Sequence, residues 1–182
     1  MPSTTTLAPQ APAAVAPTAH GYDLGLLLLR IAVGATIAVH GSQKLFGWFD
    51  GPGLTATGQG FEALGYPSGE AMALIAGLCE TFGGLGLMLG LLTPLAAAAV
   101  LGTMINAVFA VHWDSGFFAP EGFEYPMLIG LGAASLALTG PGRYAADRLL
   151  PVAPLRAHRL EYGLGAVALS LVSAIVVLLI RN

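Results

Sequence analysis

Five long apolar runs follow one another along the chain, and stretches rich in polar residues, glycine and proline separate them. The runs cover residues 24–46, 70–92, 95–111, 125–138 and 164–180. Amphipathic helices of soluble proteins carry an apolar stripe only, whereas these runs are apolar over most of their length. Because a membrane-spanning helix needs about 20 predominantly apolar residues, the pattern predicts five transmembrane helices.

The stretches between the runs predict connectors on the two sides of a membrane. Residues 47–69 and 112–124 are polar connectors, and residues 58–64 suit a short surface helix within the first of them. Thr93-Pro94 predicts a tight turn, since proline fits the first turn of a new helix. Residues 1–22, rich in proline, alanine and threonine, predict a disordered tail, and the missing basic segment argues against a signal peptide.

Composition agrees with a chain that lies mostly in lipid. Hydrophobic residues make up 55% of the 182 residues, charged residues make up 9%, and the mean hydropathy is +0.76. A soluble domain carries about a quarter charged residues, so much of this surface must face lipid. We therefore expect an all-α integral membrane bundle. It would consist of a four-helix core over residues 23–142, an arginine-rich connector over 143–161 and an additional transmembrane helix over 162–182.

The same composition excludes several kinds of site. Seven Lys and Arg residues scattered along the chain give no basic patch of the sort that binds nucleic acid. The single cysteine, Cys79, lies in an apolar run and forms neither a CxxC pair nor a metal-ligand cluster. We interpret it as a small hydrophobic side chain, and we predict no protein-bound metal and no nucleotide cofactor.

Arginine placement predicts the orientation, because cytoplasmic connectors of membrane proteins are enriched in Lys and Arg. The connector over residues 143–161 holds Arg143, Arg148, Arg156 and Arg159. The connector over residues 112–124 holds no Lys or Arg. We therefore expect the N-terminus and the 143–161 connector in the cytoplasm, and the 47–69 and 112–124 connectors outside. The C-terminus then lies outside as well, although Arg181 is a mild signal against it.

Ionisable residues within the runs are the first candidates for chemistry, because charge is costly in a membrane. Glu80 falls near the middle of the second run. It is either pinned by hydrogen bonds between helices or serves as a proton carrier or ligand contact. His40 and Lys44 are four residues apart, with Gln43 between them, so they project from one face of the first helix. Histidine exchanges protons near neutral pH, and lysine can hold an anion.

Further polar residues extend this set. Arg30 lies about 15 Å along the helix from His40, and it is either a structural arginine or the partner of a carboxylate or an anionic ligand. Asn106 suits a hydrogen bond between helices, and Glu124 suits the positive end of a helix dipole. Most of these residues approach the outer side, so we predict a polar funnel from the outer face towards mid-membrane. The candidates for catalysis are His40, Lys44, Glu80 and His112, and those for ligand binding are Arg30, Gln43, Asn106, Glu124 and Tyr125.

Four segments together resemble the DoxX family of small bacterial membrane proteins, over roughly residues 24–150. The segments are LLLLRIAVGATIAVHGSQKLFG (26–47), GLCETFGGLGLMLGLLTPLAA (77–97), MINAVFAVHWDSGFF (104–118) and EYPMLIGLGAASLALTGPGRYAAD (124–147). The positions that match the family pattern are Arg30, His40, Gly41, Lys44, Glu80, His112, Glu124 and Tyr125. The chain departs from that pattern in its N-terminal tail and in its fifth apolar run.

The resemblance implies a four-helix bundle in the bacterial plasma membrane and an association with redox systems. One related branch is a subunit of thiosulfate:quinone oxidoreductase. Another is linked to membrane oxidoreductase complexes that include a superoxide dismutase and a thiosulfate sulfurtransferase. Because functions in the family are diverse, the resemblance by itself fixes no single activity.

Hypotheses from different classes of function follow. In the first, the chain is a subunit of a quinone-linked oxidoreductase or of a redox-stress membrane complex. It has no CxxCH haem motif, cysteine cluster or dinucleotide fingerprint, so electrons would pass through a bound quinone or a cofactor on a partner subunit. In the second, it is a non-enzymatic membrane scaffold or anchor, and the arginine-rich connector contacts partners or anionic lipid. A third, a small-solute or proton pathway, rests on Glu80 alone. Self-association into a homo-oligomer stays open.

Overall fold

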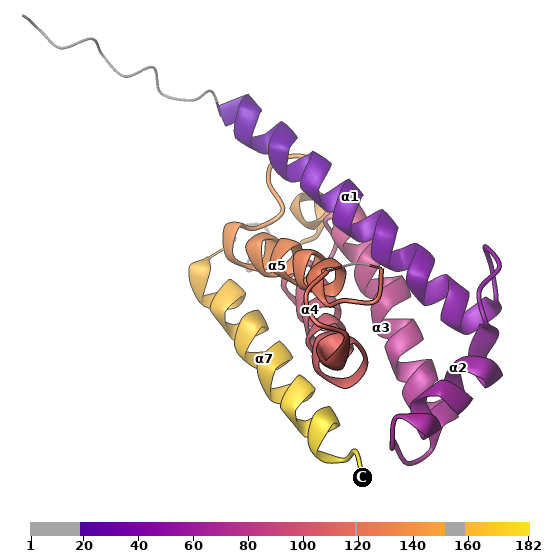
Figure 1. Ribbon diagram of the computed structural model, residues 1–182. Helices are drawn as coiled ribbons and strands as arrows, with labels where there is room; N and C mark the ends of the chain where they lie inside the picture. Colours follow the sequence, from indigo (N-terminus) through magenta and orange to yellow (C-terminus); the bar gives the residue numbers. More distant parts are fainter. Residues whose placement is uncertain (1–18, 119, 152–158) are drawn as a thin grey trace, which may run out of the picture.

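The computed structural model describes residues 19–118, 120–151 and 159–182, and within these ranges it contains helices and turns but no strands (Figure 1). The long helices are α1 (Ala19–Phe46), α3 (Gly69–Leu89), α4 (Thr93–Ala107), α5 (Glu124–Thr139) and α7 (Leu160–Leu179). The shorter elements are α2 (Gly53–Ala63), the π-helical turn η1 (Val108–His112) and the 3-10 turns η2 (Trp113–Ser115) and η3 (Ala146–Leu149). The predicted all-α class is confirmed.

Four stretches of the described chain are long and apolar enough to cross a membrane. They are His20–Phe46, Gly69–Leu89, Thr93–Ser115 and Leu160–Leu179. The sequence predicted five. The helix that falls short is α5, whose 16 residues measure about 24 Å at ~1.5 Å per residue, against a hydrocarbon core of ~30 Å. The protein is therefore a multi-pass membrane protein whose fifth long helix is shorter than a full span.

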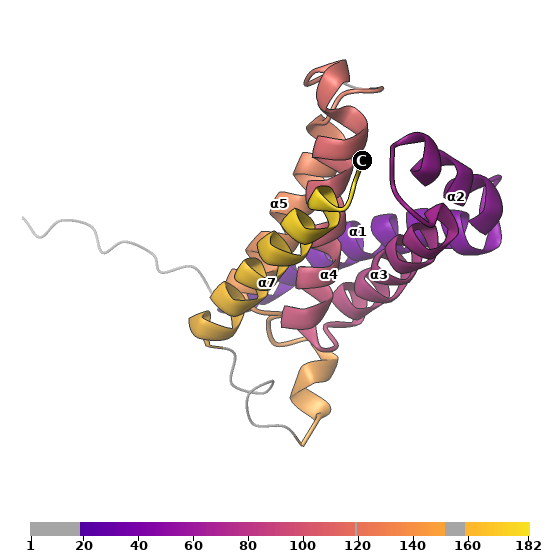
Figure 2. The same ribbon diagram turned by 90° about the horizontal axis from the view of Figure 1, so that it is seen from below.

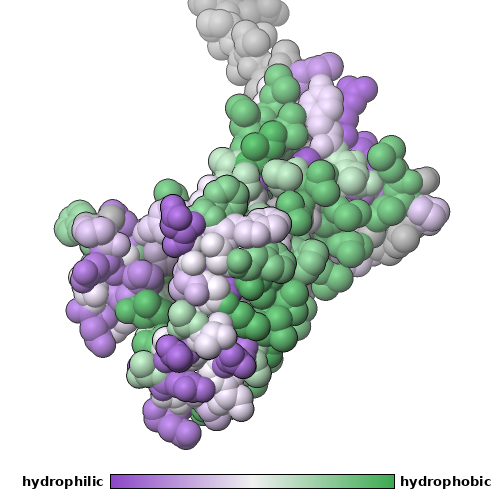
Figure 3. Space-filling model, turned by 90° about the vertical axis from the view of Figure 1, so that its right-hand side faces the viewer, coloured by the Kyte–Doolittle hydropathy of each residue, from purple (hydrophilic) through white to green (hydrophobic). Residues whose placement is uncertain are grey.

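The other long helices are arranged around α4. In both Figures 1 and 2, α4 lies between α3 and α7, and α5 lies beside α4. α1 packs along α3, and α2 folds back over the start of α3. On the face that Figure 3 shows, a broad apolar band crosses the molecule, and most polar residues gather towards its ends. That distribution is the one expected of a surface in contact with lipid.

Some predicted boundaries differ from those in the structure. α1 begins at Ala19, so residues 19–22, which the sequence assigned to a disordered tail, are helical. The rest of the predicted tail, residues 1–18, lies outside the described residues, as do residues 152–158 of the predicted arginine-rich connector, including Arg156. α2 covers Gly53–Ala63 and is longer than the surface helix predicted over residues 58–64.

Glycines bring α1 and α3 into close main-chain contact. A methyl group on Gly34 would lie 2.5 Å from the carbonyl oxygen of Gly84, and one on Gly84 would lie 2.6 Å from the main-chain nitrogen of Ala38. One turn further along the pair, Gly41 lies against Thr81. Small residues at such positions let membrane helices approach closely. This contact fixes the register of α1 against α3.

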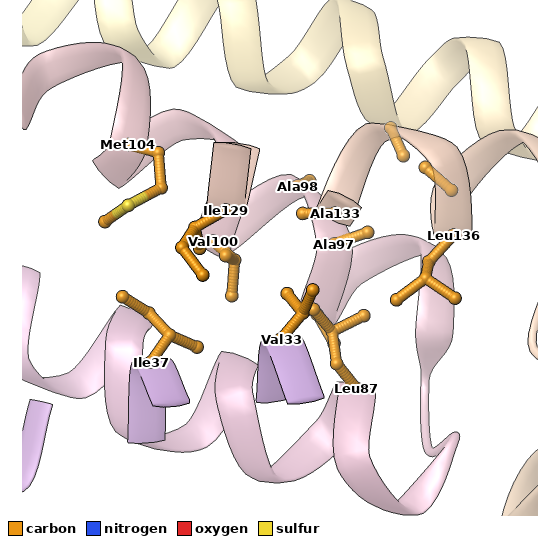
Figure 4. Close-up of a cluster of buried hydrophobic side chains, with 13 residues drawn as sticks. Val33, Ile37, Leu87, Ala97, Ala98, Val100, Met104, Ile129, Ala133 and Leu136 are labelled. Carbon is orange, nitrogen blue, oxygen red and sulfur yellow. The ribbon is translucent and has the colours of Figure 1, made fainter. Parts of the chain in front are cut away.

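The apolar core lies where α1, α3, α4 and α5 meet. Figure 4 shows its buried side chains converging from these helices. Val33 and Ile37 come from α1, and Leu87 from α3. Alanines fill much of the α4 and α5 side of the cluster, so these helices pack closely and little room is left inside the core.

A buried arginine ties one end of the bundle together. The Arg30 side chain is 1% exposed. Its Nε donates to the carbonyl oxygen of Leu87 and its Nη2 to that of Met88, each over 3.1 Å, while its Nη1 donates to those of Pro141 and Tyr144 over 2.7 and 2.8 Å. The guanidinium thus joins α1, the end of α3 and the segment that follows α5. We refer to this side of the molecule as the Arg30 end.

Asp147 completes the Arg30 end, and no sequence pattern predicted its role. Its carboxylate accepts hydrogen bonds from the main-chain N–H groups of Leu92 and Thr93 and from the Thr93 hydroxyl. These are donors at the start of α4, so a side chain from after α5 caps a helix more than fifty residues away. The Asp147 and Thr93 side chains are both fully buried, so water cannot replace the carboxylate without a rearrangement of this end.

Asp147→Asn should lower the free energy of unfolding by about 2–4 kcal/mol. The amide that replaces one carboxylate oxygen would present N–H groups to the N–H and O–H donors at the start of α4. The measurement is the thermal unfolding midpoint of the purified protein in one detergent. The matched control is Asp114→Asn, because Asp114 lies exposed in η2. Equal midpoints for the two variants would contradict this account of the Arg30 end.

Candidate functional site

Lys44 and Glu80 form an ion pair between α1 and α3. The Lys44 Nζ lies 2.5 Å from the Glu80 Oε2. Since Gly41 rests against Thr81, the α1–α3 contact places Lys44, one turn on from Gly41, beside Glu80, the neighbour of Thr81. The Glu80 side chain is 5% exposed and that of Lys44 is 26% exposed. The carboxylate is thus sequestered, whereas the ammonium group keeps an open side.

His40 lies one turn before Lys44 and contacts the start of α5. Its Nε2 is 3.1 Å from the hydroxyl oxygen of Tyr125, and the two ring centroids are 5.7 Å apart. The sequence predicted both residues as candidates but gave no sign that they touch. The pair joins α1 to α5 at the end of the bundle opposite Arg30. We call this the cavity end.

His112 is positioned by η1, which widens the last turns of α4. Single π-helical turns within α-helices are often found at functional sites. The His112 Nδ1 lies 2.6 Å from the carbonyl oxygen of Glu121. A carbonyl oxygen only accepts, so Nδ1 is the donor. In the neutral ring Nε2 therefore carries the lone pair and can accept a proton.

Asn106 lies in α4 between His112 and the middle of the bundle. Its Nδ2 donates to the carbonyl oxygen of Gly102 over 3.0 Å. Its Oδ1 is buried and has no hydrogen-bond partner among the described residues. Buried polar atoms nearly always have a partner, so this oxygen is an unsatisfied acceptor in a residue that lines the cavity, and the Asn106 side chain has to turn before a ligand there can reach it.

A cavity of about 570 Å³ brings these residues together. Its polar side chains include His40, Gln43 and Lys44 of α1, Glu80 of α3, Thr103 and Asn106 of α4, and His112 of η1. Apolar residues of α2, α3, α4 and α7 line the rest, among them Phe61, Met72, Ile75, Ala98 and Val177. The volume lies in the range of small-molecule sites, which are mainly apolar with a few converging polar groups.

Two predicted site residues lie beside this cavity rather than in its wall, and a third is distant. Tyr125 contacts His40, and Glu124 precedes it at the start of α5, but neither lines the cavity. Arg30 is at the opposite end, where its donors are taken by main-chain carbonyls. Arg30 therefore has the geometry of the structural arginine that the sequence offered as an alternative, and the structure does not bring it to a ligand.

Sequence patterns missed other parts of the cavity wall. Cys79, interpreted as a small hydrophobic side chain, lines the cavity beside Glu80. Residues of α2, such as Phe61, come from a segment predicted as a short surface helix, with no sign that it lines a cavity. α7 had no charged group in its interior to mark it, yet Ser173, Ala174 and Val177 form part of the wall. Within the described residues, no three His, Cys, Asp or Glu side chains are grouped so as to hold a metal ion.

Comparison with known proteins identifies the family. The DoxX family model matches residues 25–113. A protein of Bacillus subtilis (strain 168), named "Putative oxidoreductase CatD", is 32% identical over 126 residues, which cover 69% of this chain and 87% of the relative. The chain belongs to the DoxX family.

Two further DoxX-type relatives are similar over a comparable share. "Inner membrane protein YqjF" of Escherichia coli (strain K12) is 35% identical over 133 residues, covering 70% of this chain and 93% of the relative. "Uncharacterized membrane protein Rv3486" of Mycobacterium tuberculosis (strain ATCC 25618 / H37Rv) is 32% identical over 138 residues, covering 69% and 80%. No solved structure matches the chain significantly. The cavity residues His40, Lys44, Glu80 and His112 are among those that fall within the range that the family model matches.

Removing one partner of the Lys44–Glu80 pair should destabilise this DoxX protein more than removing both. Lys44→Met leaves a carboxylate buried without its cation and should cost about 1–3 kcal/mol of unfolding free energy, as should Glu80→Leu. The double variant Lys44→Met/Glu80→Leu should regain most of that loss, because no unpaired charge remains.

The measurement is the unfolding midpoint of the single and double variants in the same detergent. Glu70→Gln serves as the control on α3, because Glu70 is an exposed residue of the first turn. Losses that simply add up in the double variant would show that the pair is not coupled.

Proposed function

We propose that this DoxX protein binds a lipid-soluble quinone in the cavity and serves as a membrane subunit of a quinone-linked oxidoreductase or a redox-stress membrane complex. The observation that carries the proposal is the cavity itself, in which apolar walls meet the Lys44–Glu80 pair, His40, His112 and Asn106. A quinone has a planar ring with two carbonyl oxygens and a hydrocarbon tail, so it needs hydrogen-bond donors at one end and apolar contact along the rest.

The polar groups suit both redox states of such a ligand. The Lys44 ammonium has three N–H groups, of which the pair with Glu80 uses one, so it can donate to a quinone carbonyl. The Asn106 Oδ1 and the His112 Nε2 are acceptors, and they suit the hydroxyl groups that only the quinol carries. Glu80 and the two histidines can take up and release protons.

The proposed reaction balances with an external electron donor. A quinone becomes a quinol by gaining two electrons and two protons. Two thiosulfate ions that join through a new sulfur–sulfur bond to form tetrathionate release two electrons. The residues of this chain would bind the quinone, keep water from it and deliver protons to its oxygens, while a partner subunit or thiosulfate supplies the electrons. The name of the relative CatD, which includes the word oxidoreductase, agrees with this class of reaction.

The location that we propose is the bacterial plasma membrane, with the cavity end facing outward. Arg143 and Arg148 lie at the Arg30 end, where the main-chain N–H of Arg143 donates to the Asp23 carboxylate. Cytoplasmic segments are enriched in arginine, which favours the Arg30 end as the cytoplasmic one. The relative YqjF is named as an inner membrane protein.

The scaffold hypothesis accounts less well for the cavity. A scaffold needs polar groups that hold helices together, and Arg30 and Asp147 do this with their hydrogen bonds to main-chain groups. The Asn106 Oδ1, in contrast, bonds to no other helix among the described residues, although Asn106 lines the cavity. A proton or solute pathway rests on Glu80 alone, whereas the pair with Lys44 makes this carboxylate part of a set of groups at the cavity.

His112→Gln should lower thiosulfate-dependent quinone reduction about 100-fold, because it removes the proton acceptor at the cavity. The matched control is His20→Gln, which makes the same change at an exposed position near the start of α1 and should leave the rate unchanged. Both variants are assayed in lipid nanodiscs with a decyl-tailed benzoquinone and the partner proteins of the complex, after their unfolding midpoints have been compared.

Two results would contradict the proposal. One is wild-type protein that neither binds nor reduces the quinone with its partners present. The other is equal quinone reduction by His112→Gln and wild type. If instead cavity variants lost activity only together with folding and assembly, the scaffold hypothesis would gain.

A further inference from the structure

Small residues bring α7 against α4. Ser170 and Ala174 are fully buried on the face of α7 that meets the bundle. Opposite them, Gly102 of α4 lies so close that a methyl group on it would be 3.3 Å from the Ser173 hydroxyl oxygen. Contacts of this kind hold membrane helices together without bulky side chains. The position of α7 beside the cavity is therefore set by packing.

Along the same face, α7 enters the cavity wall. Ser173, Ala174 and Val177 line the cavity. Across from α7, the α3 side of the cavity is lined by residues that include Met72 and Ile75. In Figures 1 and 2, α3 and α7 lie on opposite sides of α4, so the cavity has α3 as one wall, α7 as another and α4 between them. Val177 is the largest of the α7 side chains in this wall.

The end of α7 is held in place one turn beyond Val177. The Arg181 Nε donates to the carbonyl oxygen of Leu64 over 2.6 Å, and the main-chain N–H of Asn182 donates to that of Gly65 over 2.9 Å. Tyr66, a cavity residue outside the spans, follows these acceptors in the sequence. Burial raises the pKa of its phenol, and nearby Arg181 lowers it. The last residues of the chain thus tie α7 to the connector after α2.

We propose that α7 forms the part of the binding site that selects the hydrocarbon portion of the ligand, with Val177 limiting the width of that portion. The inference rests on the proposed function and adds a specificity determinant to it. The charged and amide side chains of the cavity come from α1, α3 and α4, whereas α7 contributes Ser173, Ala174 and Val177, of which Val177 is the largest apolar side chain. A quinone whose ring meets Lys44 would then place its tail between α3 and α7. α7 lies outside residues 25–113, the range that the family model matches.

Val177→Phe should discriminate between ligands that differ only in their tails. It should raise the Kd of a decyl-tailed benzoquinone about tenfold or more, because an added ring overfills the space for the tail. The Kd of a tetramethyl benzoquinone without a tail should change by less than about twofold. The matched control is Val172→Phe, the same change on the same helix at a position that is 61% exposed; it should leave both dissociation constants unchanged.

Val177→Ala provides a second test in case the phenylalanine variant folds poorly. The smaller side chain should admit a branched isoprenoid tail. The Kd of a benzoquinone with such a tail should therefore fall about threefold relative to the Kd of the decyl-tailed benzoquinone. Binding is measured in nanodiscs with purified protein whose unfolding midpoint matches that of wild type.

The outcomes separate this inference from the proposed function. Wild-type protein that binds neither quinone overturns both. Wild-type binding with equal dissociation constants for Val177→Phe and Val172→Phe overturns the role of α7 alone. A rise in Kd in Val177→Phe that is as large for the quinone without a tail as for the decyl-tailed quinone also overturns that role. Selective weakening of the tailed quinone supports the role.

Discussion

A charge buried among membrane helices has to be matched by protein groups, because hydrocarbon offers it no hydrogen bonds and no counter-ion. Three side chains show how this constraint shapes the molecule. Arg30 donates to four main-chain carbonyls, Asp147 accepts from the start of α4, and Glu80 pairs with Lys44. Each partner lies on another part of the chain, so satisfying the charge also fixes which segments meet.

The two ends of the bundle meet this constraint in different ways, and the difference separates structure from chemistry. At the Arg30 end, Arg30 and Asp147 bond to main-chain groups and to the Thr93 hydroxyl, none of which changes its protonation near neutral pH. At the cavity end, Lys44 meets Glu80 and His40 meets Tyr125, so titratable side chains contact one another, in addition to the bonds that His112 and Asn106 make to main-chain carbonyls. Such groups can exchange protons and can turn towards a ligand. The cavity also lies at this end, which is why we assign the chemistry to it.

Helix periodicity and the cost of membrane charge were sufficient to predict much of this arrangement. The sequence predicted an all-α membrane bundle and selected His40, Lys44 and Glu80, since apolar length and buried charge are local properties of the chain. It could not pair Lys44 with Glu80, because that contact depends on the glycine-mediated register of α1 against α3. The role of Asp147 was not predicted for a related reason. It caps a helix that lies far away in sequence, and the residues around it resemble a polar connector.

Length explains the remaining differences. The apolar run of α5 was counted as a span on composition, yet a helix of 16 residues is about 24 Å long and needs neighbours to shield its ends. Its start is held by the contact between His40 and Tyr125, and its end lies near the carbonyl of Pro141 that Arg30 binds. The short helix thus receives a polar anchor at each end of the bundle.

The most apolar helix bears on function through its small residues. α7 has no charged side chain in its interior, which at first argued for a role outside the site. Because α7 approaches Gly102 closely, one of its faces lines the cavity. α7 thus forms a part of the cavity wall that lipid would otherwise form. A protein wall with fixed side chains can discriminate between hydrocarbon shapes, whereas fluid lipid adapts to any of them. An apolar helix can therefore contribute specificity to a site whose chemistry comes entirely from other helices.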